Sequence, residues 1–234
     1  MVTSAASRGG GVGTSRAIAV ASCASWRLGV ETNNIRGWYS IPAECRGYVS
    51  DYMFGELFRQ DCAVVAREAA AYAEGLELAG GGKEVWVFDI DDTSLTNLPY
   101  YADTGFGAEP YNATYFDEYV ANATAPALPE VLELYETLLA LGIKIVFITG
   151  RHEYQREPTV KNLRSAGYHT WEKLVLKPSS LGSSVVPYKS GERQKLVDAG
   201  YRIVGNIGDQ WSDLVGAPEG DRTFKVPDPM YYVG

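Results

Sequence analysis

The residues of this 234-residue chain that are best suited to chemistry are carboxylates that directly follow apolar runs. They are Asp89, Asp91 and Asp92 after the run 84–88, and Asp209 and Asp213 after the run 201–207. If these runs are neighbouring strands, the carboxylates converge, and like charges at contact distance cannot all stay ionised and unpaired. A hard cation resolves the conflict, and oxygen-only ligands with open positions suit Mg²⁺. Asp89 and Asp209 are therefore candidate metal ligands.

A carboxylate beside such a cation can also act as a nucleophile. We interpret Asp89 as the group that attacks phosphorus and forms an aspartyl-phosphate. Asp91 would protonate the leaving oxygen and later deprotonate the hydrolytic water. Thr149, at the end of another apolar run, and Lys189 could hold the transferred phosphoryl group, whose transition state spreads charge over its equatorial oxygens. Asp92 is interpreted as a supporting hydrogen-bond acceptor.

An alternation of strands and helices must bring these residues together. Apolar runs predict strands at 84–89, 144–149, 173–176 and 201–207, and helical spacing predicts helices at 129–141, 157–166 and 189–199. The first run is continuously apolar from Val85 to Phe88 and ends in the carboxylate of Asp89, which is typical of a strand buried on both faces of a parallel sheet. The alternation predicts an α/β sheet with right-handed crossovers, and in such sheets ligands bind beyond the carboxyl ends of the strands.

Two segments lie outside this alternation. Residues 44–75 carry apolar and aromatic residues at three and four spacing, which predicts helices in an N-terminal arm. Residues 97–128 form an insertion that we interpret as a lid beside the site. Its tyrosines could stack on a substrate or pack within the lid: Tyr100, Tyr101, Tyr111, Tyr115 and Tyr119. The expected organisation is a disordered tail at 1–22, a helical arm at 23–80, and a core at 81–234 that carries the insertion.

Composition excludes several other chemistries and partners. The 29 acidic against 21 basic residues give a net charge of -8, which argues against nucleic acid as a partner. Two histidines cannot build a His-rich dinuclear metal site. A cysteine phosphatase needs Cys-x5-Arg, but only four residues separate Cys62 from Arg67. No stretch of about 18 apolar residues predicts a membrane helix, and the first 22 residues lack the clear apolar region of a secretory signal.

The motifs, taken in chain order, resemble those of the haloacid dehalogenase (HAD) superfamily in its four-aspartate phosphatase branch. They are Asp89-Ile90-Asp91-Asp92-Thr93, Thr149, Lys189, and Gly208-Asp209-Gln210-Trp211-Ser212-Asp213. The chain is also similar to the plant acid phosphatase (class B) and vegetative storage protein family over nearly everything after Cys23. The segments that carry this similarity are Ser25-Trp26-Arg27, Glu31-Thr32-Asn33-Asn34, Pro42-Ala43-Glu44-Cys45, His169-Thr170-Trp171-Glu172 and Pro227-Asp228-Pro229-Met230-Tyr231-Tyr232.

The resemblance implies a Rossmann-like three-layer sandwich of the HAD type with a helical N-terminal arm and a small cap insertion. It implies Mg²⁺ and hydrolysis of small phosphomonoesters at acid pH, in a secreted or vacuolar glycoprotein and a homodimer. It implies that Asp89 is the nucleophile and Asp91 the general acid and base. Thr149 and Lys189 would bind the phosphate, and Arg151 would contact the substrate. Asp89, the Asp91 carbonyl and Asp209 would bind the metal, with Asp213 nearby or acting through water.

The cysteines and two sequence motifs give expectations about covalent modification. A chain bound for an oxidising compartment is expected to pair Cys23 with Cys45, which leaves Cys62 as a free buried thiol. Asn112-Ala113-Thr114 and Asn122-Ala123-Thr124 are candidate N-glycosylation sites within the insertion.

Two alternatives to a phosphatase stay open at this point. The first is a vegetative storage protein, an amino-acid reserve with vestigial phosphatase activity. Storage members of the family can lack the nucleophile, whereas this chain keeps Asp89, which favours an enzyme. The second is transfer of the phosphoryl group to an alcohol instead of water, which would use the same site.

Overall fold

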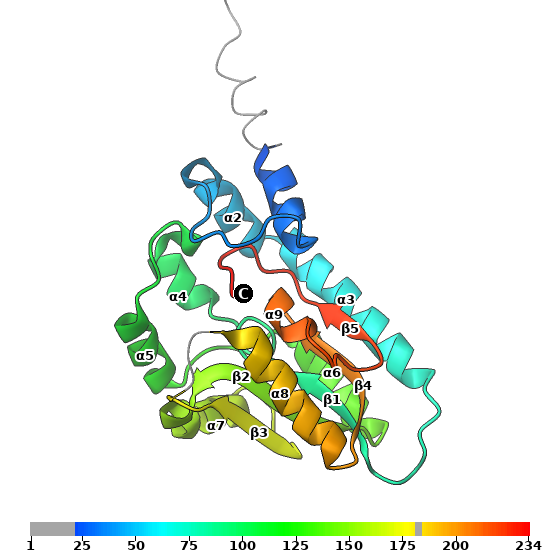
Figure 1. Ribbon diagram of the computed structural model, residues 1–234. Coiled ribbons are helices and arrows are strands. Elements are labelled where there is room, and N and C mark those ends of the chain that lie inside the picture. Colours follow the sequence, from blue (N-terminus) through cyan, green and yellow to red (C-terminus); the bar gives the residue numbers. More distant parts are fainter. Residues whose placement is uncertain (1–21, 181–183) are drawn as a thin grey trace, which may run out of the picture.

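The protein folds around a five-stranded sheet that has helices on both faces (Figure 1). The computed structural model describes residues 22–180 and 184–234. All strand pairs are parallel, and the strand order is β3-β2-β1-β4-β5. The strands are β1 Glu84–Phe88, β2 Lys144–His152, β3 Lys173–Lys177, β4 Arg202–Gly208 and β5 Thr223–Lys225. The predicted α/β sheet is therefore confirmed.

The central strand β1 is buried along its whole length because helices cover both of its faces. Trp86 and Phe88 belong to the larger hydrophobic core, which includes residues of α3 (Glu56–Glu74) and α6 (Pro129–Ala140). Val85 and Val87 belong to a second core on the opposite face, against α8 (Val185–Asp198). Successive side chains of a strand point to opposite faces, so a strand covered on both sides is apolar at every position.

The helices begin and end close to their predicted positions, with one correction. Helix α6 has Pro129 in its first turn, where a missing N–H costs nothing, and α7 spans Arg156–Ser165. Helix α8, however, begins at Val185, four residues before the predicted start at 189. Pro187 lies in the first turn of α8, where a proline ring is tolerated, so the helix can begin before this proline. Lys189 therefore lies inside the helix.

The predicted N-terminal arm contains the helices that its spacing indicated and one more. Helices α2 (Arg46–Met53) and α3 follow the short η1 (Ala43–Cys45). A further helix, not predicted, covers 22–31. A disulfide joins Cys23 in that helix to Cys45, and Cys62 is a buried free thiol. The tail expected at 1–22 lies outside the described residues except for Ser22.

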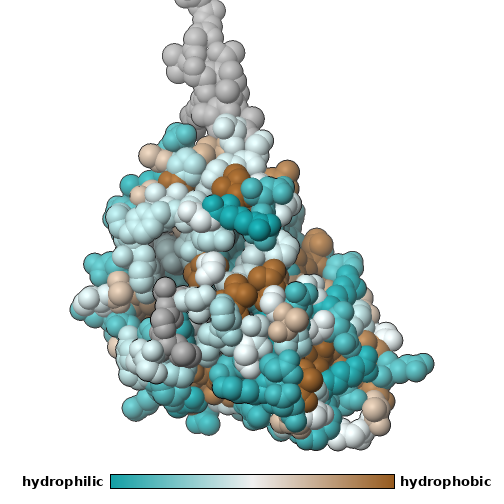
Figure 2. Space-filling model, viewed as in Figure 1, coloured by the Kyte–Doolittle hydropathy of each residue, from teal (hydrophilic) through white to brown (hydrophobic). Residues whose placement is uncertain are grey.

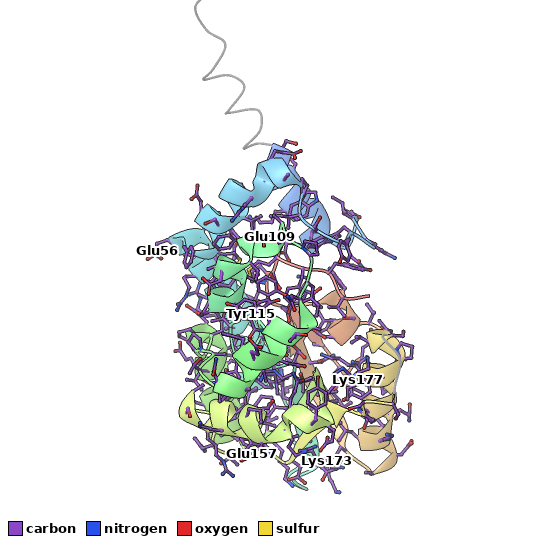
Figure 3. The ribbon with its side chains drawn as sticks, turned by 90° about the vertical axis from the view of Figure 1, so that its left-hand side faces the viewer. Glu56, Glu109, Tyr115, Glu157, Lys173 and Lys177 are labelled. Atoms are coloured by element: carbon purple, nitrogen blue, oxygen red, sulfur yellow. A yellow bond between two sulfur atoms is a disulfide. The ribbon has the colours of Figure 1, made fainter. Side chains whose placement is uncertain are left out.

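The insertion at 97–128 is itself folded. It contains α4 (Leu98–Asp103), η2 (Gly105–Gly107) and α5 (Ala113–Asn122). Figure 3 shows it between the arm, marked by Glu56, and α7, marked by Glu157, with Tyr115 on the side that faces the viewer. Tyr100 packs against four aromatic rings, those of Tyr101, Tyr115, Phe116 and Tyr119. Much of the tyrosine content therefore holds the insertion together.

Hydrophobic residues on the face shown in Figure 2 form small separate patches among hydrophilic ones. Within 22–180 and 184–234, none of the helices combines the length and apolar character required to cross a membrane.

Candidate active site

Four of the predicted site residues lie together at the carboxyl-terminal edge of the sheet. Asp89 directly follows β1, and Asp209 directly follows its neighbour β4. Asp213 lies in α9 (Trp211–Leu214). Each of these three buried carboxylates offers an oxygen within 4.8 Å of the others. Lys189 reaches the same place from α8, so four separate segments build one cluster.

Gly208 makes room for this arrangement. A Cβ atom at position 208 would lie 2.4 Å from the Cβ of Asp213, closer than any side chain tolerates. The Asp213 carboxylate is then fixed by the backbone N–H of Gln210, which donates to its Oδ2 at 2.9 Å. The glycine before Asp209 is therefore required for the position of Asp213.

Lys189 joins two of the carboxylates. Its Nζ donates to Oδ1 of Asp89 and, at 2.6 Å, to Oδ1 of Asp213. The three side chains are 4%, 7% and 5% exposed, respectively. Burial alone would lower the pKa of Lys189, but the Asp213 and Asp89 carboxylates outweigh it and raise the pKa. The two carboxylates therefore favour the charged form of Lys189.

The charge balance of the cluster fits a divalent cation. Lys189 pairs with Asp89 and Asp213, and within residues 22–180 and 184–234 no cation pairs with Asp209, so three buried carboxylates share one paired positive charge. Burial, and to a smaller extent the Asp213 carboxylate, raises the pKa of Asp209 to about 6, so the site as it stands disfavours the negative charge of this group. The donors are all oxygens, the type that Mg²⁺ takes. The residues present therefore suit a hard divalent cation.

Asp91 has a different partner from Asp89, although the two residues are only two positions apart. Arg151 Nε and Nη2 both donate to the Asp91 carboxylate, at 3.0 and 2.8 Å to Oδ1. Asn97 Nδ2 donates to the same oxygen at 2.8 Å. Burial alone would raise the pKa of Asp91, but the Arg151 guanidinium outweighs it and lowers the pKa. The remaining Arg151 Nη1 donates to Thr159 Oγ1, so the guanidinium is oriented on both sides.

The turn after β1 supports the cluster from behind. Ser94 Oγ donates to the Asp89 carbonyl at 2.7 Å, and Thr93 Oγ1 donates to Asp209 Oδ1 at 3.0 Å. Asp92 has a positive φ of 52° and accepts the Asn97 backbone N–H at 2.8 Å. Its role as a hydrogen-bond acceptor within the turn is therefore confirmed.

A pocket of about 470 Å³ opens above the cluster, and segments far apart in the chain line it. The predicted site residues that line it are Asp89, Asp91, Arg151, Lys189 and Asp213. Its other walls are rich in aromatic side chains. The arm, the insertion and the C-terminal residues 226–234 supply Trp38, Tyr39, Tyr101, Tyr111, Phe116, Tyr231 and Tyr232, and η3 (Glu153–Gln155) supplies Tyr154. Of the insertion's tyrosines, Tyr101 and Tyr111 face this pocket. The insertion therefore forms a wall of the candidate site.

Two predicted residues lie behind the pocket wall. Thr149 is fully buried within β2, and its Oγ1 accepts the backbone N–H of Arg151 at 3.1 Å. Asp209 is also buried, and Thr93, Gln210 and Tyr231 donate to it. A phosphate contact by Thr149 stays a prediction.

Sequence reasoning missed Asn97 and Tyr231 as parts of this site. Asn97 lies six positions after Asp91 in a turn whose path no pattern indicated. Tyr231 belongs to one of the segments that carry the family resemblance, but no spacing linked it to Asp209, 22 positions earlier.

Known proteins similar to this chain include both an enzyme and a storage protein. Acid phosphatase 1 of Solanum lycopersicum is 48% identical over 212 residues, 90% of this chain and 83% of that protein. Vegetative storage protein 1 of Arabidopsis thaliana is 46% identical over 214 residues, 91% of this chain and 79% of that protein. The Class C acid phosphatase from Bacillus anthracis has a TM-score of 0.67 over 80% of this chain and 85% of that chain. Its 23% identity limits this likeness to the fold.

Residues 10–234 match the family described as HAD superfamily, subfamily IIIB (Acid phosphatase). The match covers the arm, the sheet and every residue of the carboxylate cluster. The chain belongs to this family of acid phosphatases.

Proposed function

We propose that the protein is a Mg²⁺-dependent acid phosphatase that hydrolyses phosphomonoesters through an aspartyl-phosphate on Asp89. The observation that carries the proposal is the contact of one buried ammonium group, Lys189, with both Asp89 and Asp213 at the base of a pocket. This geometry presents a carboxylate nucleophile beside a fixed positive charge.

In the first half-reaction, a carboxylate oxygen of Asp89 forms a bond to phosphorus while the bond from phosphorus to the ester oxygen breaks. Asp91 gives its proton to that leaving oxygen, and the alcohol departs. Lys189 stays beside the phosphoryl oxygens, where its charge stabilises the transition state. The Arg151 guanidinium and the Asn97 amide hold the Asp91 carboxylate in its orientation.

In the second half-reaction, Asp91 accepts a proton from water, and the water oxygen forms a bond to phosphorus. The bond between phosphorus and the Asp89 oxygen breaks, so the carboxylate is regenerated and inorganic phosphate leaves. Bound Mg²⁺, held by Asp89, Asp209, Asp213 and the Asp91 carbonyl, would act as a Lewis acid that neutralises the phosphoryl charge. We propose phosphate contacts for Thr149 and Arg151 on the family resemblance alone.

Storage is the second candidate function, and the identity to vegetative storage protein 1 favours it about as much as the identity to acid phosphatase 1 favours an enzyme. The complete set of Asp89, Asp91, Lys189, Asp209 and Asp213 supports catalysis, because a pure reserve protein has no need of it. Abundance, and depletion under nitrogen demand, would support storage.

Turnover of an aryl phosphate across pH, with Mg²⁺ and then with a chelator, tests the proposal. Asp89→Asn is the control variant because it removes the nucleophile and keeps the size of the side chain. We expect hydrolysis at acid pH that depends on Mg²⁺ and is absent from the control. A rate no higher than that of Asp89→Asn under every condition would instead favour storage.

We also propose that the protein is secreted or vacuolar. The disulfide between Cys23 and Cys45 suits an oxidising compartment. Asn112 and Asn122 are both exposed, and Asn112 caps α5 through Oδ1, which leaves its Nδ2, the atom that carries a glycan, outside the cap bond. Mass spectrometry of unreduced peptides from native tissue tests this. Free thiols at both cysteines and bare asparagines at both sites would contradict it.

A further inference from the structure

The C-terminal segment, residues 226–234, lies against the loop that carries Asp209. The Val226 backbone N–H donates to the Gly208 carbonyl at 2.9 Å, and the Val233 N–H donates to Gln210 Oε1 at 3.0 Å. The segment is thus attached on both sides of Asp209. Figure 1 shows this last part of the chain, in red, ending near the middle of the molecule beside α9.

Tyr231 is the residue of this segment that touches the cluster. Its hydroxyl donates to Asp209 Oδ2 at 2.9 Å. Its ring stacks on Tyr101 of the insertion, with centroids 5.3 Å apart and planes 9° apart. Stacking on Tyr101 therefore holds the Tyr231 ring, and the hydrogen bond to Asp209 holds its hydroxyl group.

The backbone before Tyr231 is held in place independently of the ring. Met230 is fully buried, and its N–H donates to Asp228 Oδ1 at 2.8 Å. Gly107 has a φ of +85°, and a Cβ there would lie 1.8 Å from the Met230 carbonyl oxygen, so only glycine permits this contact. The insertion and the C-terminal segment are therefore packed backbone to backbone next to Tyr231.

The hydrogen bonds to Asp209 are divided unequally between its two oxygens. Oδ2 accepts from Tyr231 and from Gln210 Nε2 at 2.9 Å, whereas Oδ1 accepts from Thr93 Oγ1. A carboxylate has about four lone-pair positions, two on each oxygen. These bonds fill Oδ2 and leave room on Oδ1 for a further partner.

We infer that Tyr231 is a positioning residue for metal binding: its hydroxyl fixes the Asp209 carboxylate through Oδ2, which would leave Oδ1 available to a bound cation. The inference rests on the proposed Mg²⁺ dependence. Groups that hydrogen-bond to a metal ligand orient it, and their removal typically weakens metal affinity by about 10–100-fold. Tyr231 also lines the pocket, but the proposed role belongs to its hydroxyl group and acts through Asp209.

Tyr231→Phe tests the inference because it removes the hydroxyl and keeps the ring that stacks on Tyr101. Tyr52→Phe is the matched control, since Tyr52 makes the same kind of bond, to Asp61 Oδ2 at 2.8 Å, in the N-terminal arm. The metal-free full-length proteins are titrated with Mg²⁺ in a calorimeter. Turnover is then measured against Mg²⁺ concentration, and thermal unfolding is followed without metal.

We expect the Mg²⁺ dissociation constant of Tyr231→Phe to rise about tenfold, with that of Tyr52→Phe unchanged. At saturating Mg²⁺, the kcat of Tyr231→Phe should approach that of the wild type, which a merely structural defect would not allow. Equal Mg²⁺ affinity in Tyr231→Phe and wild type would overturn the inference and leave the proposed function intact. Wild-type protein that binds no Mg²⁺ would instead overturn the proposed metal role, and this inference with it.

Discussion

Lys189 contacts Asp89 across one hundred positions of the chain, and both side chains are almost completely buried. Removing one partner of a buried ion pair leaves the other charge without compensation. The pair is therefore coupled to the stability of the fold as well as to chemistry at Asp89.

Lys189→Met should destabilise the metal-free protein by about 3–5 kcal/mol, because the buried Asp89 and Asp213 carboxylates then both lose the ammonium group that pairs with them. Added Mg²⁺ should restore part of this loss, since it supplies positive charge to the same oxygens. Denaturant unfolding with and without Mg²⁺ measures both effects. Lys195→Met is the control on the same helix: Lys195 is 71% exposed and pairs with Glu192 at the surface, so its loss should cost at most about 1 kcal/mol. Equal losses for the two variants would contradict the account.

Gly208→Ala should displace Asp213, because the new methyl group would overlap the Asp213 side chain. Overpacking of this kind typically costs about 1–3 kcal/mol, and Mg²⁺ affinity should fall with it. Gly191→Ala is the matched control in α8, where a Cβ meets nothing within 4 Å and should stabilise the helix by up to about 1 kcal/mol. Urea unfolding and Mg²⁺ titration compare the two variants. Unchanged metal affinity in Gly208→Ala would argue against Asp213 as a ligand.

The pH dependence should report the pairing of Asp91 with Arg151. A general acid works in its protonated form, so the rate falls as pH rises through its pKa. The Arg151 guanidinium lowers the pKa of Asp91, which confines the protonated form to acidic pH. Arg151→Met should raise that pKa and move the alkaline limb of the pH–rate profile for an alkyl phosphate to higher pH.

The position of this limb is separate from the size of the rate, so a loss of activity in Arg151→Met does not obscure it. Arg156→Met serves as the control, because Arg156 pairs with Glu153 at the surface. An alkaline limb that stays in place, or moves to lower pH, in Arg151→Met would contradict Asp91 as the general acid.

Asp91→Asn should separate the two carboxylates of the first motif. The variant keeps the Asp89 nucleophile and loses proton transfer, which is typically worth about 10²–10⁴-fold. An activated aryl phosphate needs little protonation of its leaving oxygen, so its phosphorylation step should be impaired far less than that of an alkyl phosphate. Single-turnover release of the alcohol measures this step. Equal losses on both substrates, with folding and metal affinity intact, would force a different role for Asp91.

Much of the sheet could be predicted from the chain because parallel strands buried on both faces are apolar at every position. The run at 84–88 is β1, and the apolar stretches within β2 and β4 follow the same rule, whereas the edge strand β3 is only partly buried. Strand β5, only three residues long, is too short for a pattern to show. The helix at 22–31 lies within the predicted helical arm, but only residues 44–75 had the spacing that locates a helix. The insertion gave no sign of the helices that it contains.

The carboxylate cluster was predictable for a related reason. Asp89 and Asp209 follow strands that are adjacent in the sheet, so topology alone brings them together. The pairing of Asp91 with Arg151 was not predictable, because the two residues are 60 positions apart in the sequence. Only the folded geometry shows that Arg151, within β2, contacts Asp91. Tyr231 was hidden for the same reason: its hydrogen bond depends on how the last residues pack against the insertion.

Trapping of the covalent intermediate tests the central claim most directly. Asp91→Asn should slow the second half-reaction, because the variant cannot take a proton from water, so an acyl phosphate should accumulate with an activated aryl phosphate and Mg²⁺. The reaction is quenched in acid and the peptides are analysed by mass spectrometry. We predict one phosphoryl group on the peptide that contains Asp89, and hydroxylamine should remove it. The label should be absent from the double variant that carries both Asp91→Asn and Asp89→Asn. Turnover without that label, or a label on another residue, would contradict the account.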